Sequence, residues 1–171
     1  MTAIRDDFKR AMGHLASGVV IVTTRDSAGE PRGMTATAVC SVSLEPPLVM
    51  ACMGHESATH RAVESSGVFA INVLPAAARE LAGRFSSRSD DKFADVRLTK
   101  GESGAPLLAV ALAHCDCRVE QSVAAGDHTI FIGRVLSVHA PDEPNGPLIY
   151  FRGAYGSVAP VDADDRDRRG T

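Results

Sequence analysis

Residues 113–120 read Ala-His-Cys-Asp-Cys-Arg-Val-Glu, and this stretch does most to decide the fold. Every second residue from Ala113 to Val119 is small or apolar and the others are polar, which is the period-two pattern of a half-buried strand. Turn-forming residues follow at 124–127, and residues 128–139 then form a second run that is apolar on both faces. Two strands joined by a short turn predict an antiparallel pair.

The remainder of the chain also consists largely of short strand-like segments separated by turn chemistry. Glycine, proline and polar clusters at 27–31, 45–47 and 145–147 mark the turns. The segments between them are rich in β-branched, small and apolar residues. Strands are therefore predicted over residues 19–24, 34–42, 48–53, 68–74 and 148–151.

Three short helices are predicted beside these strands. Ile4, Phe8, Met12 and Leu15 form one apolar stripe at helical spacing. Ser57 or Thr59 can cap a second helix that runs through residue 64. A third helix is predicted to begin at residue 75, a proline, and to end at residue 83, a glycine. Residues 86–105 are polar and are predicted to form a long loop.

These elements predict a mainly β protein, an antiparallel barrel with a few short flanking helices. A doubly wound sheet would need a helix after nearly every strand. No repeat or linker divides the chain, so residues 1–160 are expected to form a single domain. Residues 161–171 carry mixed charges with almost no apolar side chain, and we expect this tail to be disordered.

Composition excludes several classes of function. The chain has 171 residues, a net charge of −3, six Phe, two Tyr and no Trp, which argues against a nucleic-acid-binding surface. No apolar run is long enough to span a membrane, and the N-terminus does not resemble a secretory signal. The four cysteines lack metal-ligand spacing and are interpreted as small buried side chains. We expect a cytoplasmic protein without a metal.

Common cofactor and catalytic motifs are also missing from the sequence. No two glycines are separated by a single residue, so there is no dinucleotide fingerprint of the Gly-x-Gly-x-x-Gly type. The phosphate-binding loop, the zinc-protease helix and the hydrolase Gly-x-Ser-x-Gly elbow are absent as well. Any nucleotide must therefore be bound in another way.

Four segments in order resemble one known family. They are residues 10–19, residues 33–49 beginning Gly-Met-Thr-Ala-Thr-Ala, residues 126–135 with Gly-Asp-His and Ile-Gly-Arg-Val, and residues 147–156. Together they are similar to the flavin reductase family, the reductase components of two-component flavin-dependent monooxygenases. The similarity extends over about residues 5–157.

The resemblance implies an FMN-binding split barrel of Greek-key type that forms a homodimer with flavin sites near the subunit interface. It also implies an oxidoreductase that transfers a hydride from NADH or NADPH to FMN, or to FAD or riboflavin. Reduced flavin would then supply a separate monooxygenase. The choice between NADH and NADPH, and between FMN and FAD, stays open.

The same resemblance suggests the site. His128 is the candidate residue for positioning the nicotinamide or supplying a proton, because a histidine titrates near neutral pH. The candidate flavin contacts are Thr35, Ala36, Thr37, Ala38, Ser41, Ser43, Cys52, Met53 and Tyr155. Ser57 and Thr59, at a helix N-terminus, are candidates for the flavin phosphate. Phe85, Ser86, Arg88 and Lys92 would complete the phosphate and ribityl site.

Structural interpretations of these residues remain open at this point. The small residues at 35–38 can simply build a strand, Ser57 and Thr59 can merely cap a helix, and Arg88 and Lys92 can be solvated charges. Two other functions also remain: a flavin-binding protein without reductase activity, and an oxidoreductase that keeps FMN as a prosthetic group.

Overall fold

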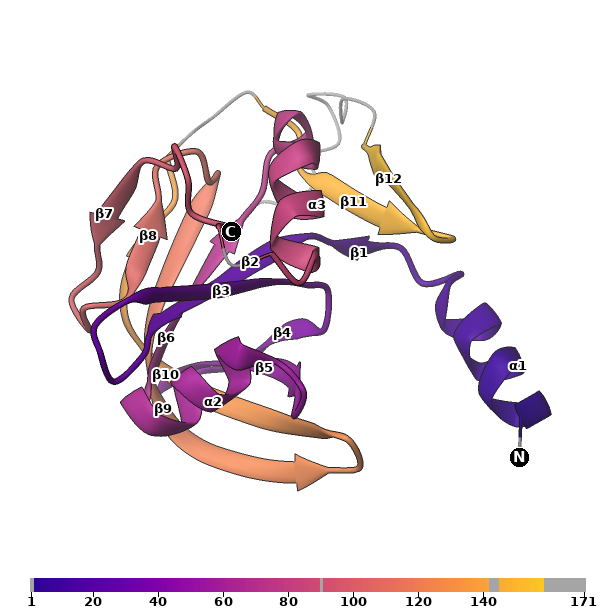
Figure 1. Cartoon of the computed structure of the whole chain (residues 1–171), viewed down its shortest axis with the longest axis horizontal. Coiled ribbons are helices and arrows are strands. Elements are labelled where there is room, and N and C mark those ends of the chain that lie inside the picture. Colours follow the sequence, from indigo (N-terminus) through magenta and orange to yellow (C-terminus); the bar gives the residue numbers. More distant parts are fainter. Residues whose placement is uncertain (1, 90, 142–144, 159–171) are drawn as a thin grey trace.

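The computed structural model describes residues 2–89, 91–141 and 145–158, and Figure 1 shows its arrangement. The predicted tail at 161–171 lies outside these ranges. Strands dominate the described part of the chain, which confirms the predicted mainly β class.

Seven strands form one antiparallel sheet in the order β3-β2-β6-β9-β10-β5-β4. Their bounds are Val20–Arg25 for β2, Pro31–Ala36 for β3, Val39–Leu44 for β4, Pro47–Gly54 for β5, Val68–Val73 for β6, Ala113–Ala125 for β9 and His128–His139 for β10. A three-stranded sheet joins β1 (Ser17–Gly18), β11 (Leu148–Phe151) and β12 (Ala154–Ser157), and a two-stranded sheet joins β7 (Leu98–Lys100) and β8 (Pro106–Leu108).

The predicted hairpin is present as β9 and β10, but the polar face of β9 is exposed only from Arg118 onward. His114 and Asp116 are buried because the segment that carries β8 covers this face. The Asp116 carboxylate accepts hydrogen bonds from the Ser103 amide at 2.6 Å and hydroxyl at 2.5 Å. The His114 ring bonds the Leu108 carbonyl at 2.8 Å. These buried polar groups have partners, as stability requires. The prediction of a half-exposed strand was therefore wrong for His114 and Asp116, whereas Arg118 and Glu120 are exposed as predicted.

All three predicted helices are present, but some of their ends differ from the predictions; the first helix ends at Met12, so Leu15 of the predicted stripe lies beyond it. Helix α2 (Ala58–Ser66) is capped by Ser57, whose side-chain oxygen accepts the Thr59 amide hydrogen at 3.1 Å. A 3-10 turn, η1 (Ala76–Ala78), leads into α3 (Arg79–Ser86). Gly83 was predicted to end this helix but lies inside it. Among the described residues, no helix is long and apolar enough to cross a membrane.

Helix α1 (Thr2–Met12) stands apart from the sheets in Figure 1. Its apolar stripe is not buried: Ile4 is 76% exposed and Phe8 is 65% exposed. The turn that follows is tied to the β11–β12 turn, where the Arg152 amide donates to the Gly13 carbonyl at 2.9 Å. The stripe therefore faces outward in the single chain.

Three further predictions about strands need correction. The single strand expected over residues 34–42 is divided into β3 and β4 by a break at residues 37–38. The loop expected over residues 86–105 contains β7, which pairs with β8. Strand β12, which had not been predicted, pairs with β11 through a turn that includes Gly153 at positive φ.

Two hydrophobic clusters pack on the sheet. One includes Phe69 and Phe131, which have no exposed surface, and the other includes Phe85 of α3. Gly133 lies in β10 against the first cluster. A Cβ atom at Gly133 would stand 2.5 Å from the Phe69 ring and 3.0 Å from the Cys117 Cβ atom. This position has no space for a side chain.

Gly133→Ala should therefore destabilise the protein by about 2 kcal/mol, because overpacking a dense core forces the neighbours to move. Gly83→Ala is the matched control, since no atom lies within 4 Å of its added methyl group and alanine favours a helix. Urea unfolding followed by circular dichroism measures both free energies. A Gly133→Ala variant as stable as the wild type would contradict this account of the packing.

Candidate functional site

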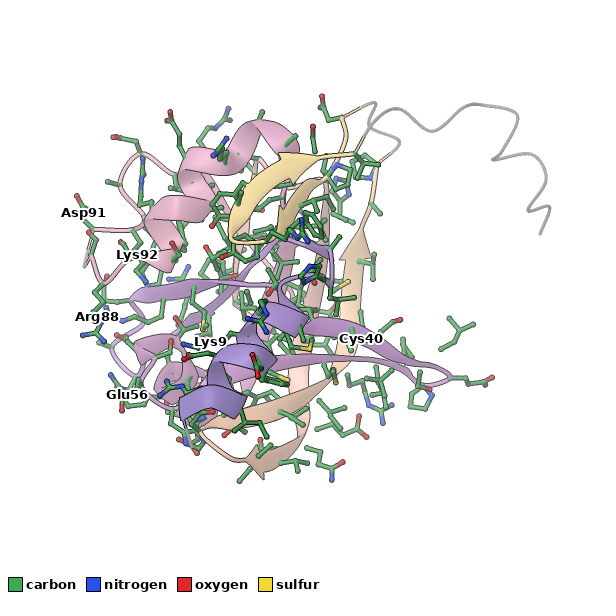
Figure 2. All side chains as sticks on the ribbon, turned by 90° about the vertical axis from the view of Figure 1, so that its right-hand side faces the viewer. Lys9, Cys40, Glu56, Arg88, Asp91 and Lys92 are labelled. Carbon is green, nitrogen blue, oxygen red and sulfur yellow. The ribbon has the colours of Figure 1, made fainter. Side chains whose placement is uncertain are left out.

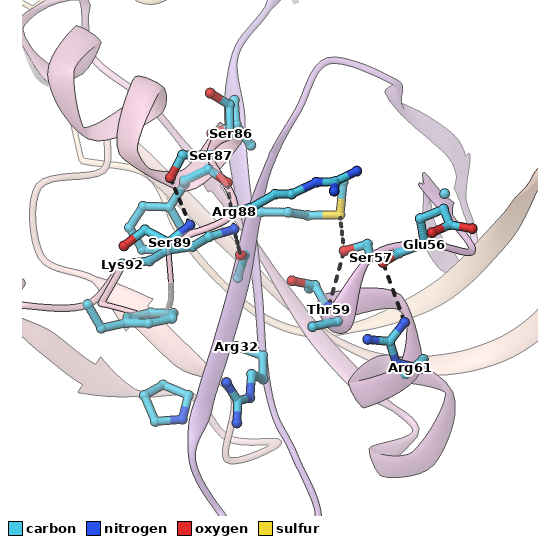
Figure 3. Close-up of a pocket in the computed structure, with 18 of the residues that line it drawn as sticks. Arg32, Glu56, Ser57, Thr59, Arg61, Ser86, Ser87, Arg88, Ser89 and Lys92 are labelled. Carbon is cyan, nitrogen blue, oxygen red and sulfur yellow. Dashed lines mark hydrogen bonds between the residues drawn. The ribbon is translucent and has the colours of Figure 1, made fainter.

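A cavity of about 580 Å³ lies between the edge strand β3, the start of α2, the end of α3 with the loop after it, and the start of β10 (Figure 3). Its wall includes Gly54 at the end of β5, Glu56 between β5 and α2, and Ser87, Ser89 and Phe93 after α3. The volume lies within the range of small-molecule sites in proteins. Segments distant in the sequence thus meet around one space.

The start of α2 forms one wall of the cavity. Ser57 caps the helix, and its hydroxyl also lies 3.3 Å from the Met34 sulfur on β3. A helix N-terminus carries unpaired N–H groups and a partial positive charge, both of which favour an anion. Arg61 adds a charge in the first turn of this helix, and its guanidinium donates to the Glu56 carbonyl at 3.4 Å.

The end of α3 and the loop after it form the opposite wall. The Lys92 ammonium donates to the Phe85 carbonyl at 3.1 Å and to the Gly33 carbonyl at 3.4 Å, which joins this loop to β3. The Phe85 ring packs edge-on against Phe93, with 4.8 Å between the ring centroids. In Figure 3 the Arg88 side chain points across the cavity from the α3 side. An exposed arginine thus faces a helix N-terminus, and Figure 2 shows Arg88, Lys92 and Glu56 along the same edge of the molecule.

Positive charge dominates the cavity lining. Its ionisable side chains besides His128 are Arg32, Arg61, Arg88, Lys92 and Glu56, so four basic groups face one carboxylate. One of them, Arg32, is paired with the Asp26 carboxylate at 2.7 Å. Hydrogen bonding to Arg32 lowers the pKa of Asp26. The cavity therefore suits an anionic ligand.

His128 also lines this cavity, at the first position of β10. Its Nδ1 atom is 2.7 Å from an Asp127 carboxylate oxygen, and hydrogen bonding to this ring lowers the pKa of Asp127. Its Nε2 atom would lie 3.5 Å from a Cβ atom at Gly54, so the glycine leaves room for the ring. The histidine side chain is 50% exposed. The ring is thus oriented by Asp127 and accessible to a ligand.

The cavity brings together eight of the residues that sequence analysis suggested. They are Thr35, Ser57, Thr59, Phe85, Ser86, Arg88, Lys92 and His128. One of these differs from expectation in its chemistry: the Thr35 hydroxyl donates to the Ala82 carbonyl at 2.7 Å. Its proton is therefore already used to hold α3 against β3.

The other suggested residues do not line this cavity. Ala36 and Met53 are packed in the first hydrophobic cluster, Thr37 and Ala38 lie in the break between β3 and β4, and Ser41 and Ser43 are on the edge strand β4. Cys52 is partly buried in β5, which raises its thiol pKa. Tyr155 packs against Tyr150 across the β11–β12 pair. Flavin contact by these residues stays a prediction.

Several residues of the cavity were missed from the sequence, notably Arg32, Arg61, Ser87 and Ser89. Arg61 could have been predicted from the sequence, because it falls one helical turn after the predicted cap at Ser57. The indication for Arg32 is weaker: it lies on the same face of β3 as Met34, two residues further on. Among the described residues, no group of three His, Cys, Asp or Glu side chains is placed to hold a metal ion.

Comparison with known proteins assigns the chain to a family. The family model described as "Flavin reductase like domain" matches residues 12–159. A curated protein named flavin reductase (NADH), from Kitasatospora aureofaciens, is 41% identical over 163 residues, which cover 94% of this chain and 85% of the relative. The chain belongs to the flavin reductase-like family.

Two other members support the same assignment. The reductase subunit HsaB of a flavin-dependent monooxygenase from Rhodococcus jostii is 39% identical, over 90% of this chain and 77% of the relative. The NADH:FAD oxidoreductase SgcE6 of Streptomyces globisporus, solved with NAD and FAD fragments, matches with a TM-score of 0.86 and 39% identity. The match covers 94% of this chain and 95% of the SgcE6 chain. The predicted family and split-barrel fold are confirmed.

Proposed function

We propose that this flavin reductase-like protein transfers a hydride from NADH to a flavin held in the cavity, and that the reduced flavin serves a separate monooxygenase. The observation that carries the proposal is a cationic cavity whose lining includes a histidine oriented by Asp127. The names of the relatives support it, because they include NADH-dependent flavin reductases and reductase components of monooxygenases.

The donor set of the cavity fits a flavin phosphate. The N-terminus of α2, the Arg61 and Arg88 guanidinium groups and the Lys92 ammonium border one space and together favour a dianionic group. Ser86, on the α3 side of the cavity, is exposed; its hydroxyl donates to the Gly83 carbonyl at 2.8 Å, and its oxygen can still accept a hydrogen from a ribityl hydroxyl. We propose FMN as the acceptor, with FAD as an alternative, since relatives named for each are known.

The chain contributes binding and orientation to this reaction. A bound flavin would supply the redox chemistry by accepting the hydride on its ring system. The Asp127 carboxylate holds Nδ1 of His128, which leaves Nε2 for the nicotinamide end of NADH. Hydride transfer needs the reacting atoms held at roughly 3–3.5 Å. The main task of His128 is therefore to fix the nicotinamide ring beside the flavin.

We also propose that the protein forms a homodimer through α1 and the β11–β12 hairpin. Ile4 and Phe8 on α1 and Tyr150 and Phe151 on β11 are large apolar residues that are exposed in the single chain. An amphipathic helix normally buries its apolar stripe, and exposed apolar patches mark protein interfaces. A second subunit would cover these surfaces.

The function is tested by mixing the pure protein with flavin and nicotinamide and following absorbance at 340 nm. We expect oxidation of NADH that depends on added FMN or FAD, with slower oxidation of NADPH. Loss of the yellow colour on desalting, with activity restored by added flavin, would show that the flavin is a substrate. Retention of the colour would show that the flavin is a prosthetic group. No flavin-dependent oxidation of either nicotinamide would overturn the proposal.

Two substitutions should separate binding of the flavin phosphate from binding of the nicotinamide. Arg88→Ala should raise the KM for FMN about tenfold and change the KM for riboflavin little, because a charge-assisted hydrogen bond to phosphate is lost. His128→Ala should raise the KM for NADH about tenfold and leave the KM for FMN within twofold.

Arg79→Ala, an exposed arginine on α3 outside the cavity lining, is the matched control and should leave all three KM values unchanged. Equal effects of Arg88→Ala on FMN and riboflavin would contradict the phosphate assignment. Unchanged NADH kinetics in His128→Ala would contradict a role of this histidine in binding NADH and would indicate that its role is structural.

The dimer is tested by light scattering, which should give a mass of twice the 18.0 kDa of the chain. Phe8→Glu should shift the protein towards the monomer, because it places a charge in the middle of the apolar stripe. Val110→Glu is the control, since Val110 is also exposed but lies before β9, away from α1. A monomeric wild-type protein at micromolar concentration would contradict the proposed interface.

A further inference from the structure

Directly after His128, the Thr129 hydroxyl lies between two histidine rings. It is 2.8 Å from Nε2 of His60 and 3.1 Å from Nε2 of His55. Thr129 belongs to β10 and is only 7% exposed, because its side chain points to the face of the strand opposite to that of His128. His60 lies on α2, and His55 lies in the turn between β5 and α2.

The protons of this cluster can be counted. A threonine hydroxyl has one hydrogen to donate, so it can donate to one ring and accept from the other. The His60 Nδ1 atom is buried, has no hydrogen-bond partner and lies 4.0 Å from a Glu64 carboxylate oxygen. A hydrogen on Nδ1 would be attracted by this carboxylate, whereas a lone pair would be repelled. Thr129 therefore donates to His60 and accepts the hydrogen of His55 Nε2.

The surroundings of His60 keep its ring neutral. It is 5% exposed and packs on Phe131, with 5.3 Å between the ring centroids. Burial lowers the His60 pKa, the nearby charges of His55, Arg61 and His128 act in the same direction, and Glu64 opposes them. A protonated His60 would lose its acceptor atom for the Thr129 hydroxyl. Asp127 also faces this cluster, since its carbonyl accepts the His55 amide hydrogen at 3.1 Å.

The cluster joins two elements that line the cavity. Helix α2 carries Ser57 and Thr59, and β10 carries His128. We infer that Thr129 and His60 are positioning residues, whose hydrogen bond holds His128 at a fixed distance from the α2 wall and so sets the nicotinamide against the flavin. This inference rests on the proposed reductase function.

The first test substitutes Thr129 itself. Thr129→Val keeps the shape but removes the hydroxyl, and it should raise the KM for NADH about tenfold while the KM for FMN stays within twofold. Thr129→Ser restores the hydroxyl and should return the NADH KM to within twofold of the wild-type value. A purely structural role would lower stability without this difference between the two substrates.

Thr23→Val provides the matched control. Thr23 is a fully buried strand threonine whose hydroxyl donates to the Pro106 carbonyl and accepts a hydrogen from Asn72, away from the cavity lining. Its removal should lower the melting temperature as Thr129→Val does but leave the NADH KM unchanged. Equal NADH KM values for the two folded valine variants would overturn the inference.

Two measurements keep the inference testable if Thr129→Val does not fold. His55→Ala alters an exposed residue, removes the donor to Thr129 and should raise the NADH KM at least threefold; an unchanged KM would overturn the inference. Nitrogen-15 NMR of the histidine rings should show hydrogen on Nδ1 of His60 and on Nε2 of His55, and the opposite tautomers would also overturn it. Absence of NADH oxidation by the wild type would instead reject the proposed function, because the ring tautomers do not depend on activity.

Discussion

The position of β10 between β9 and β5 is the constraint on which the rest of the site depends. The register pairs His128 with Gly54 and Thr129 with Met53, and it pairs the same two residues with the end of β9. Successive residues of a strand point to opposite faces, so a slip of one residue would exchange His128 and Thr129. The ladder of backbone hydrogen bonds on both sides of β10 prevents this exchange. Orientation of the cavity histidine thus begins with sheet pairing rather than with contacts of its own side chain.

Around this strand, the cavity depends on contacts between elements that are distant in the sequence. Lys92 joins the loop after α3 to the β3 backbone, and Thr35 joins β3 to α3 itself. Ser57 connects the start of α2 to Met34 on β3. Few of these bonds are strong individually, since a hydrogen bond in a protein contributes about 1 kcal/mol. Together they hold the elements that bring four basic groups around one cavity. If these groups were dispersed over the surface, they would only be solvated.

Periodicity in the sequence predicted the fold well where a strand or helix has one simple environment. The β9–β10 hairpin and the Ser57 cap follow from local patterns. The burial of Asp116 on β9 does not follow from the alternating pattern, because it depends on Ser103, a partner from another segment. Gly83 does not end α3, because it is not among the glycines with the positive φ that a helix-ending glycine adopts.

The candidate site could be predicted only in part. Arg88 and His128 were suggested by resemblance to a family, and no local pattern distinguishes them from ordinary surface residues. Arg32 and Arg61 were missed because their inclusion in the cavity depends on how β3 and α2 are packed. The Thr129 cluster was also beyond sequence analysis, since His55 and His60 meet this residue across about seventy positions, by the sheet register.

The central claim is that this cationic cavity is where the flavin binds. Chemical-shift mapping of backbone amides during an FMN titration tests it most directly. The account predicts large shifts for Ser57, Thr59, Arg88 and Lys92, and none for β7 and β8, which do not line the cavity. Shifts concentrated outside the cavity, with those four amides unchanged, would contradict it.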